Sequence, residues 1–424
     1  MHTFYVQLTK LQRIYKNMVS VGVLQVANYL IPFLVLPIIS RILGATLFGS
    51  VSYAQNIISY LTLLVNFGFE YSATRQIALA GEDKEAKRRI FWAVLSVKAL
   101  LLLLSFAILA ILPLFIPRIT ADPALYIYTA LINIGIVLFP TWYLQGEQQM
   151  DKMAWANFFI KLLGAALVLL LVREASAYRL YPLLLSVASI LVGGCALIYV
   201  IRHFGLGGFV CTRAALCEVV SPSWPIFLNN LFGSLYTTVN MTLLGIYVAD
   251  NIVGYFSAAQ KLVMALIMVV VLPVSISVFP EISRRFEESK ESGIAFLKRA
   301  MLYAGSAAAV VSLATYLVAP LAIRIVYGAD FTPAIQILRW LSPIPFLVMT
   351  ATLLTIQGLY GIGLQRYAPW VGFTLAVVCI TMNMILIPRI GVRAVCISWV
   401  VAEVLECLLS GTILFIKGGK ETTE

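Results

Sequence analysis

Charged residues are scarce in this sequence. Asp, Glu, Lys and Arg make up 12% of its 424 residues and hydrophobic residues 61%, whereas a soluble domain carries about 25% charged residues. Histidine occurs only at His2 and His203, which leaves almost no material for a zinc site or a Ser/His/Asp hydrolase. The six cysteines form no Cys-x-x-Cys pair and no Cys/His ligand set, so we expect no disulfide framework, metal or other cofactor. These absences exclude an ordinary soluble enzyme.

Basic residues outnumber acidic ones, 30 to 19, which gives a formal net charge of +11. In a soluble protein such an excess would suggest a nucleic-acid partner. Here the charges lie in short clusters between long apolar runs, and no basic face exists outside the segments that border those runs. We interpret the excess as membrane topology together with an anionic ligand, and we predict no nucleic-acid partner.

Twelve stretches of the sequence are predominantly apolar over about 20 residues, the length that a membrane-spanning helix needs. They are residues 18–40, 48–67, 91–115, 125–143, 153–172, 180–201, 224–248, 253–279, 300–323, 335–356, 369–388 and 392–415. The sequence therefore predicts an all-α polytopic membrane protein, whose connections are too short to hold a catalytic domain.

Lys and Arg residues concentrate in the even-numbered connections and the two terminal segments. Because cytoplasmic loops carry the excess of basic residues in membrane proteins, this bias predicts that both termini are cytoplasmic, in agreement with an even number of spans. The first stretch follows Lys10, Arg13 and Lys16, but it is too long for a signal-peptide core and no small-residue cleavage site comes after it. We expect it to be retained as a span.

Two segments share a pattern in which a glycine precedes a glutamine by six residues. Residues 43–55 read LGATLFGSVSYAQ, and residues 244–260 read LGIYVADNIVGYFSAAQ. A weaker echo pairs Leu-Gln-Gly at 144–146 with Ile-Gln-Gly at 356–358. The pattern indicates an internal repeat, and the alternative is that two hairpins merely share loop chemistry.

The repeat predicts two six-helix lobes, residues 1–205 and 206–424. Because six is an even number, both lobes enter the membrane from the same side. The repeat is then parallel, with a pseudo-twofold axis along the membrane normal. We expect a central cavity between the lobes.

Four basic residues lie inside the predicted spans: Lys98, Lys161, Lys261 and Arg339. A cation at mid-membrane costs about 2.5–3.5 kcal/mol on insertion scales and usually faces the bundle interior, a water-filled cavity or a partner. None of the four has a carboxylate three or four residues away on its own helix. They are candidates to bind an anionic group, and the alternative is that they extend to the nearer lipid headgroups.

Acidic residues and two further cations add candidates near the spans. Arg41, Glu70 and Arg75 flank the second span and could line an entrance, or Glu70 and Arg75 could pair or cap the helix end. Glu403 and Glu406 lie mid-depth in the last span on one helix face, as in proton-coupled transporters. Together with Glu70 they are candidates for ion coupling, and the alternatives are neutralisation by an inward base or retention of a proton.

Amide side chains also interrupt the spans and could bind sugar hydroxyls. An alternative is helix-to-helix hydrogen bonding. The candidates that we expect to face a sugar are Asn28, Gln55, Asn229, Asn240 and Gln260.

Four segments carry a resemblance to a known family. They read SRILG with FG at 40–44 and 48–49, FGFEYSATR at 67–75, FPTWYLQG at 139–146, and VGYFSAAQK at 253–261. No segment is specific alone, but their order and spacing in a twelve-span frame resemble the Wzx-type polysaccharide flippases of bacteria. These form a branch of the multidrug/oligosaccharidyl-lipid/polysaccharide (MOP) exporter superfamily, and the resemblance covers the whole chain.

The resemblance implies a V-shaped transporter of two six-helix lobes that works by alternating access in the bacterial inner membrane. It implies no covalent chemistry, so the protein is not expected to be an enzyme. The implied substrate is an undecaprenyl-diphosphate-linked oligosaccharide, turned over from the cytoplasmic to the periplasmic leaflet for O-antigen or similar polymers. Cavity Lys and Arg would hold the diphosphate. Membrane lipid, a polysaccharide polymerase and a chain-length regulator are the implied partners.

One departure and three alternatives bear on this interpretation. Where relatives often carry an acid in span seven, this chain has Asn240, which puts ion coupling at that position in doubt. A lipid II flippase is a close alternative. A drug/cation antiporter usually needs a membrane carboxylate in the first lobe, and spans one to six have no clear mid-span acid. A membrane polymerase or glycosyltransferase would need a long external loop or an acidic metal motif, and the sequence has neither.

Overall fold

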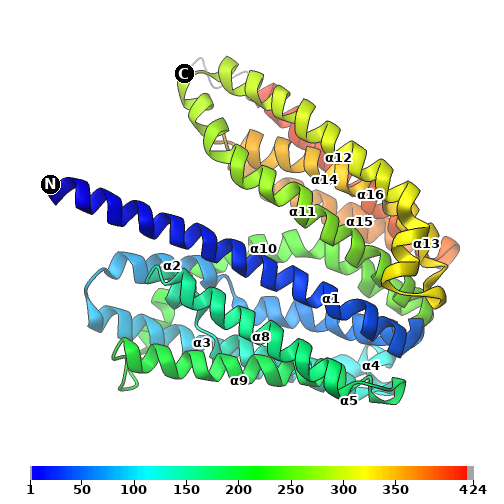
Figure 1. Ribbon diagram of the computed structural model, residues 1–424, viewed down its shortest axis with the longest axis horizontal. Coiled ribbons are helices and arrows are strands. Elements are labelled where there is room, and N and C mark those ends of the chain that lie inside the picture. The colour runs from blue at the N-terminus through cyan, green and yellow to red at the C-terminus, as the bar shows by residue number, and fades with distance from the viewer. Residues whose placement is uncertain (1, 418–424) are drawn as a thin grey trace. The chain divides into compact units, whose positions relative to one another are not determined.

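The computed structural model describes the backbone of residues 2–417 and the side chains of residue 31 and residues 33–416, except residues 235, 236, 272 and 276. This part of the chain is helical and contains no strand (Figure 1). The α-helices are α1 (His2–Asn66), α2 (Phe69–Ala80), α3 (Lys84–Ile111), α4 (Pro117–Ala121), α5 (Pro123–Ala130), α6 (Ile132–Leu138), α7 (Thr141–Gly146), α8 (Met150–Leu171), α9 (Leu180–His203), α10 (Arg213–Tyr247), α11 (Asp250–Glu288), α12 (Lys290–Val326), α13 (Ala334–Leu341), α14 (Ile344–Thr352), α15 (Ala368–Ile390) and α16 (Val392–Lys417). A π-helix, η4 (Leu353–Leu359), follows α14, and short 3₁₀ turns lie at Leu112–Leu114, Ala175–Ala177, Ala329–Phe331 and Gln365–Tyr367.

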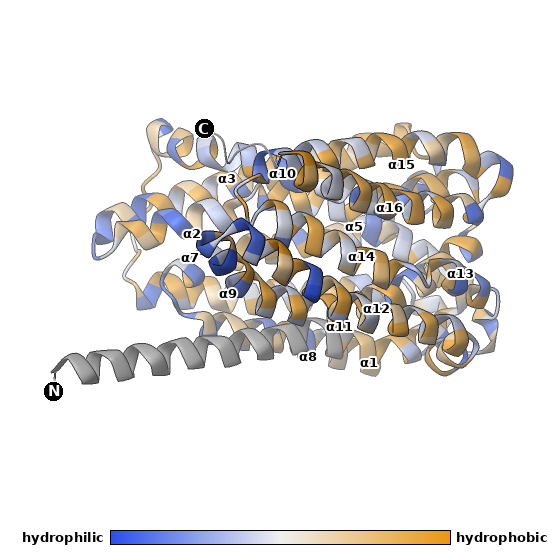
Figure 2. Cartoon of the chain, turned by 90° about the horizontal axis from the view of Figure 1, so that it is seen from above, coloured by the Kyte–Doolittle hydropathy of each residue, from blue (hydrophilic) through white to orange (hydrophobic). Residues whose placement is uncertain are grey.

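Ten helices of the described residues are long and apolar enough to cross a membrane. Large apolar side chains on them remain exposed, such as Leu103 at 67% and Leu317 at 64%, and hydrophobic residues predominate along α15 and α16 (Figure 2). Lipid rather than water suits such a surface. The predicted all-α polytopic membrane fold is confirmed.

The number of twelve spans stays a prediction. One candidate span, Phe33–Ala80, is 48 residues long and covers the end of the first predicted stretch and all of the second. The seventh predicted stretch lies on α10, which is not among the ten. Where a connection was expected near residue 44, α1 consists of two helices that meet at a kink, and Gly44 leaves helical geometry there, at φ 65° and ψ 176°. Glycine accepts this positive φ because it has no Cβ.

The chain forms two compact units. The first unit comprises Met1–Leu43 and Ala54–Asn230, and the second unit comprises Gly44–Tyr53 and Leu231–Glu424. In the first unit α9 packs against α6 and α8, and in the second α11 packs against α12 and α15 against α16 (Figure 1). Ten residues of α1 thus belong to the second unit. The lobe boundary expected at residues 205 and 206 stays a prediction.

The two repeat segments contact each other inside the second unit through their glycines. A Cβ on Gly49 would overlap the carbonyl oxygen of Asp250 and lie 2.7 Å from the backbone nitrogen of Gly254. A Cβ on Gly254 would overlap the carbonyl oxygen of Ala45 and lie 3.2 Å from the nitrogen of Gly49. Each glycine therefore meets the other and the residue four positions before the other, as a twofold relation between the segments requires. This reciprocal contact supports the internal repeat.

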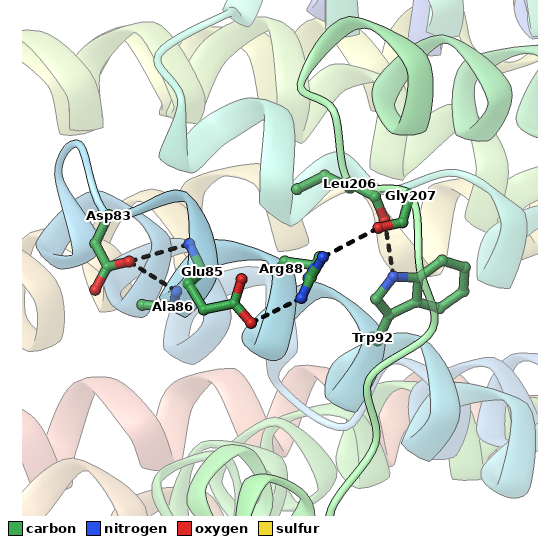
Figure 3. A network of polar contacts seen from close by, with 7 residues as sticks. All are labelled: Asp83, Glu85, Ala86, Arg88, Trp92, Leu206 and Gly207. Atoms are coloured by element: carbon green, nitrogen blue, oxygen red, sulfur yellow. Dashed lines mark hydrogen bonds and ion pairs between the residues drawn. The ribbon is translucent and has the colours of Figure 1, made fainter.

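A polar network fixes the start of α3 in the first unit (Figure 3). The Asp83 carboxylate caps the helix by accepting from the backbone N–H groups of Glu85 and Ala86, each at 3.0 Å. About two turns further along α3, the Trp92 indole donates to the Leu206 carbonyl oxygen at 2.9 Å. Arg88 links Glu85, at 2.8 Å, to the Gly207 carbonyl oxygen, at 3.4 Å. The connection after α9 is thereby tied to α3.

Asp122 makes three side-chain contacts near the points where α5 and α9 begin. Its carboxylate caps α5 at Leu125 N, 3.3 Å away, accepts from the Tyr178 hydroxyl at 2.7 Å, and pairs with Arg179 Nε at 3.0 Å. Burial and the hydrogen bond to Asp122 raise the pKa of Tyr178. One carboxylate thus joins two connections that are more than 50 residues apart in the sequence.

Asp122→Ala is expected to destabilise the protein by about 1–3 kcal/mol, because it removes a helix cap and leaves the Tyr178 hydroxyl without its acceptor. Thermal unfolding of the purified protein in detergent measures the effect. Glu174→Ala is the matched control, since Glu174 lies in the same connection as Tyr178 and its carboxylate accepts from the nearby Ser176 hydroxyl, at 3.3 Å, without joining another connection among the described residues. Equal melting temperatures of the two variants would contradict the role given to Asp122.

Candidate functional site

Lys98 is enclosed within the first unit. It lies on α3, its side chain is 2% exposed, and its ammonium donates to the Asn66 side-chain oxygen at 3.5 Å and to the Ile136 carbonyl oxygen at 3.3 Å. The carboxylate that acts on it electrostatically is Glu70. Two oxygen atoms of neighbouring helices thus accept hydrogen bonds from the Lys98 ammonium, and almost none of the residue is exposed. Lys98 is therefore closed to a ligand in this structure.

The side chains of Lys161 and Lys261 are more exposed than that of Lys98. Both are half-buried, on α8 and α11 respectively. Lys161 makes no hydrogen bond or ion pair with any side chain that the structure describes. Lys261 Nζ lies 3.4 Å from Ser52 Oγ and 4.6 Å from the centroid of the Phe48 ring. A hydroxyl and an aromatic face stabilise a cation without neutralising it, so the Lys261 charge remains able to attract an anion.

Arg339 and Arg41 are placed differently. Arg339 lies on α13, half-buried, with its guanidinium carbon 5.3 Å from the centroid of the Tyr316 ring and its Nε buried without a hydrogen-bond partner. Arg41 is exposed on α1, three residues before the break at Gly44.

Glu70 and Arg75 line a pocket of about 330 Å³ in the first unit together with Tyr71, Thr74 and Gln145. The predicted alternative of a Glu70–Arg75 ion pair is absent from the described residues, and both side chains are exposed. Glu70 lies in the first turn of α2, where a negative charge is favoured by the helix dipole. The pocket offers a carboxylate, a guanidinium, a hydroxyl and an amide, a set that suits a polar ligand.

Glu403 and Glu406 form a polar cluster in the second unit. Glu403 is 2% exposed and accepts from the Trp399 indole at 3.1 Å. Glu406 accepts from the Thr355 hydroxyl at 3.1 Å, and Thr355 also contacts Ser410 Oγ at 2.7 Å. Over the side chains from residue 33 to residue 416 that are described, neither carboxyl has an ion-pair partner, so the inward base considered as an alternative is not there. A buried and a half-buried carboxyl without a cation are costly when both are charged.

The amide candidates separate into two groups. The Asn240 side chain is fully buried, and its oxygen accepts from Asn383 Nδ2 at 2.6 Å, while the Gln55 side chain lies beside the Tyr181 hydroxyl. These two make the helix-to-helix contacts that were the alternative. Asn229 is exposed on α10 and Gln260 is half-buried on α11. The side chain of Asn28 lies outside the described residues.

Sequence reasoning missed the partners that set the state of each charge. Asn66 was noted as an amide within a span but was not connected with Lys98, and Trp399 beside Glu403 and Phe48 and Ser52 beside Lys261 were not singled out. For Phe48 and Ser52 a signal existed, since both lie in the repeat segment and are four residues apart, on one helix face. Trp399 and Glu403 carried the same signal, since they are four residues apart on α16. For Asn66 no signal existed, because the packing of α1 against α3 decides which polar residue meets Lys98.

The solved structures most informative about this fold are transporters. The chain is similar to an inward-facing multidrug resistance MATE family transporter of the MOP superfamily, with a TM-score of 0.66, 17% identity, and coverage of 96% of this chain and 100% of that one. It is also similar to the lipid II flippase MurJ in an inward closed conformation, with a TM-score of 0.68, 16% identity, and coverage of 91% and 87%. The fold is thus that of MOP-superfamily membrane transporters.

The family follows from the sequence itself. A family model described as polysaccharide biosynthesis protein matches residues 14–286, more than half of the chain, and the protein belongs to this family. Two relatives are each named "Putative O-antigen transporter". The one from Escherichia coli (strain K12) is 25% identical over 81% of this chain and 82% of its own length. The one from Shigella dysenteriae is 28% identical over 92% of this chain and 97% of its own length. The predicted resemblance is confirmed, and so is the transporter class, as opposed to an enzyme.

Proposed function

We propose that the protein is a flippase for an undecaprenyl-diphosphate-linked oligosaccharide, the O-antigen unit or a related polysaccharide unit. It moves this lipid from the cytoplasmic to the periplasmic leaflet of the bacterial inner membrane by alternating access, with both termini cytoplasmic. Family membership and the names of the two relatives support the substrate class. The polyprenyl tail stays in lipid, while the diphosphate and the sugars need polar protein groups.

The observation that carries the proposal is the state of Lys261. It is a cation within a membrane-spanning helix, it is half-buried, and its neighbours among the described side chains are an aromatic ring and a hydroxyl but no carboxylate. Such a charge is costly to keep in a membrane unless it has an anionic partner for part of the time. A diphosphate is a concentrated anion that makes charge-assisted hydrogen bonds with Lys and Arg. Lys161 and Arg339 are further candidates, and Lys98 would first have to leave Asn66 and Ile136.

Complementation tests this function. The chain is expressed in a bacterium that lacks its own O-unit flippase and makes the matching lipid-linked oligosaccharide, and surface polysaccharide is measured. Restored polymer is the expected result. If the protein is present in the membrane, the oligosaccharide is made and no polymer appears, the proposal fails. If the chain instead rescues a strain that lacks the lipid II flippase, the substrate is lipid II.

We further propose that the Glu403–Glu406 pair couples transport to proton movement. When the pair binds one proton, the repulsion between the two carboxylate charges is removed. The other titratable groups that act on the pair are Cys379 on α15 and Cys407 on α16. Neither thiol can supply a compensating positive charge. A proton is therefore the partner that can change the charge of the cluster.

Glu403→Gln is expected to abolish the dependence of transport on an imposed proton gradient. The glutamine keeps the acceptor for the Trp399 indole, so the fold should be retained. Transport in vesicles with and without a pH gradient gives the readout. Glu287→Gln is the control, since Glu287 is exposed near the end of α11. An unchanged response of Glu403→Gln to the gradient would remove this carboxyl from the coupling.

A further inference from the structure

The second unit contains a groove that is lined by none of the candidate site residues. It has a volume of about 570 Å³ and lies between α13, the start of α14 and the first turns of α16. Trp340 and Pro343 line one side. Arg393, Ile397, Val400 and Val401 line the other, with Cys396, which is 1% exposed, between them. The size is within the range of about 300–1,000 Å³ that is typical of ligand sites.

The walls of the groove are apolar along one helix face. Residues 393, 397, 400 and 401 recur at the spacing of a single face of α16, and Ile397 and Val401 are 45% and 36% exposed. From Arg393 to Val401 the helix rises about 12 Å. An apolar trough of this length on an exposed face of a membrane-spanning helix matches the upper part of an extended acyl chain.

One end of the groove is cationic. Arg393 is the second residue of α16, directly after the turn at Gly391, so it stands where the span begins. Its guanidinium carbon lies 5.2 Å from the centroid of the Trp340 ring. No carboxylate pairs with Arg393 anywhere in the described residues. Tryptophan is enriched at the level of the lipid headgroups, which places this unpaired cation at the same level.

We propose that this groove is a binding site for an anionic glycerophospholipid of the surrounding bilayer. The phosphate contacts Arg393 above the Trp340 ring, and one acyl chain follows the trough past Ile397 to Val401. A soluble anion would match the guanidinium but leave the apolar walls exposed, and a neutral lipid would match the walls but leave the charge unpaired. Only a lipid with a net negative headgroup matches both. This site is separate from the transported substrate and does not depend on the proposed function.

Native mass spectrometry of the purified protein with added phosphatidylglycerol or phosphatidylethanolamine tests the site. The wild type should retain phosphatidylglycerol in preference to phosphatidylethanolamine. Arg393→Gln should weaken phosphatidylglycerol binding about fivefold, which corresponds to about 1 kcal/mol for one interfacial cation, and leave phosphatidylethanolamine unchanged. Ile397→Trp fills the trough and should weaken both lipids.

Arg389→Gln is the matched control, since Arg389 is an exposed cation in the last turn of α15 that does not line the groove. It should bind both lipids as the wild type does. The proposal is overturned if Arg393→Gln retains phosphatidylglycerol like the wild type, if Arg389→Gln loses it equally, or if Ile397→Trp changes neither lipid. Preferential binding of undecaprenyl phosphate over phosphatidylglycerol would overturn the choice of occupant.

Discussion

Lys261→Ala is expected to reduce transport of the lipid-linked oligosaccharide by about tenfold or more while the protein still inserts and folds. A charge-assisted hydrogen bond contributes about 1.5–3 kcal/mol, and 1.4 kcal/mol is a factor of ten. Removing the cation also removes its cost in the membrane, so no loss of stability is expected. Surface polysaccharide, normalised to the amount of protein in the membrane, measures the effect.

Two variants make this result specific to the charge of Lys261. Lys261→Arg keeps the charge but not the shape of the ammonium, so it should restore transport in part. Lys298→Ala removes an exposed lysine from α12 and should transport like the wild type. Export by Lys261→Ala at the wild-type level would exclude Lys261 from the substrate path.

Gly254→Ala is expected to destabilise the second unit by about 3 kcal/mol or more, at the upper end of overpacking effects. The added methyl would overlap the carbonyl oxygen of Ala45, which is backbone and cannot rotate away as a side chain would. Gly49→Ala should have a similar effect, because its methyl would overlap the carbonyl oxygen of Asp250. Thermal unfolding in detergent detects both as a lower melting temperature.

Gly372→Ala is the control for this prediction. Gly372 lies inside α15, its φ is not positive, and an added Cβ would meet nothing within 4 Å. Alanine is favoured over glycine inside a helix by about 1 kcal/mol, so this variant should be as stable as the wild type or more so. If Gly254→Ala melts at the same temperature as Gly372→Ala, the close contact between the repeat segments does not exist in solution.

Hydropathy was sufficient to predict most of the helices, because a span in lipid must be apolar for its whole length. The stretch expected at 180–201 is α9, Leu180–His203, and the one expected at 153–172 is α8, Met150–Leu171. Hydropathy does not show a break inside an apolar run, although a proline, which disfavours a continuous helix, stands at two such breaks, Pro140 and Pro343. The fourth stretch, 125–143, is divided into α5, α6 and the start of α7, and the tenth, 335–356, is interrupted between α13 and α14 and ends in the π-helix η4.

The candidate charges could be predicted, but not their surroundings. Lys98 and Lys261 were equivalent in the sequence, as cations in apolar helices without a local acid. The structure distinguishes them, since Lys98 is closed by Asn66 and a backbone carbonyl, whereas Lys261 faces a ring and a hydroxyl. These neighbours lie between 32 and 213 residues away in the sequence. Arg393 was overlooked because a basic residue at a span end is explained by topology alone.

Reconstitution in vesicles tests the central claim most directly. Purified protein is placed in lipid vesicles that contain a fluorescent undecaprenyl-diphosphate oligosaccharide, and a membrane-impermeant reductant quenches the label that is exposed outside. With the wild type, quenching should extend from the outer-leaflet fraction to nearly all of the label, whereas Lys261→Ala vesicles should stay near the protein-free level. Quenching that stops at the outer-leaflet fraction with correctly folded wild-type protein would contradict the flippase account.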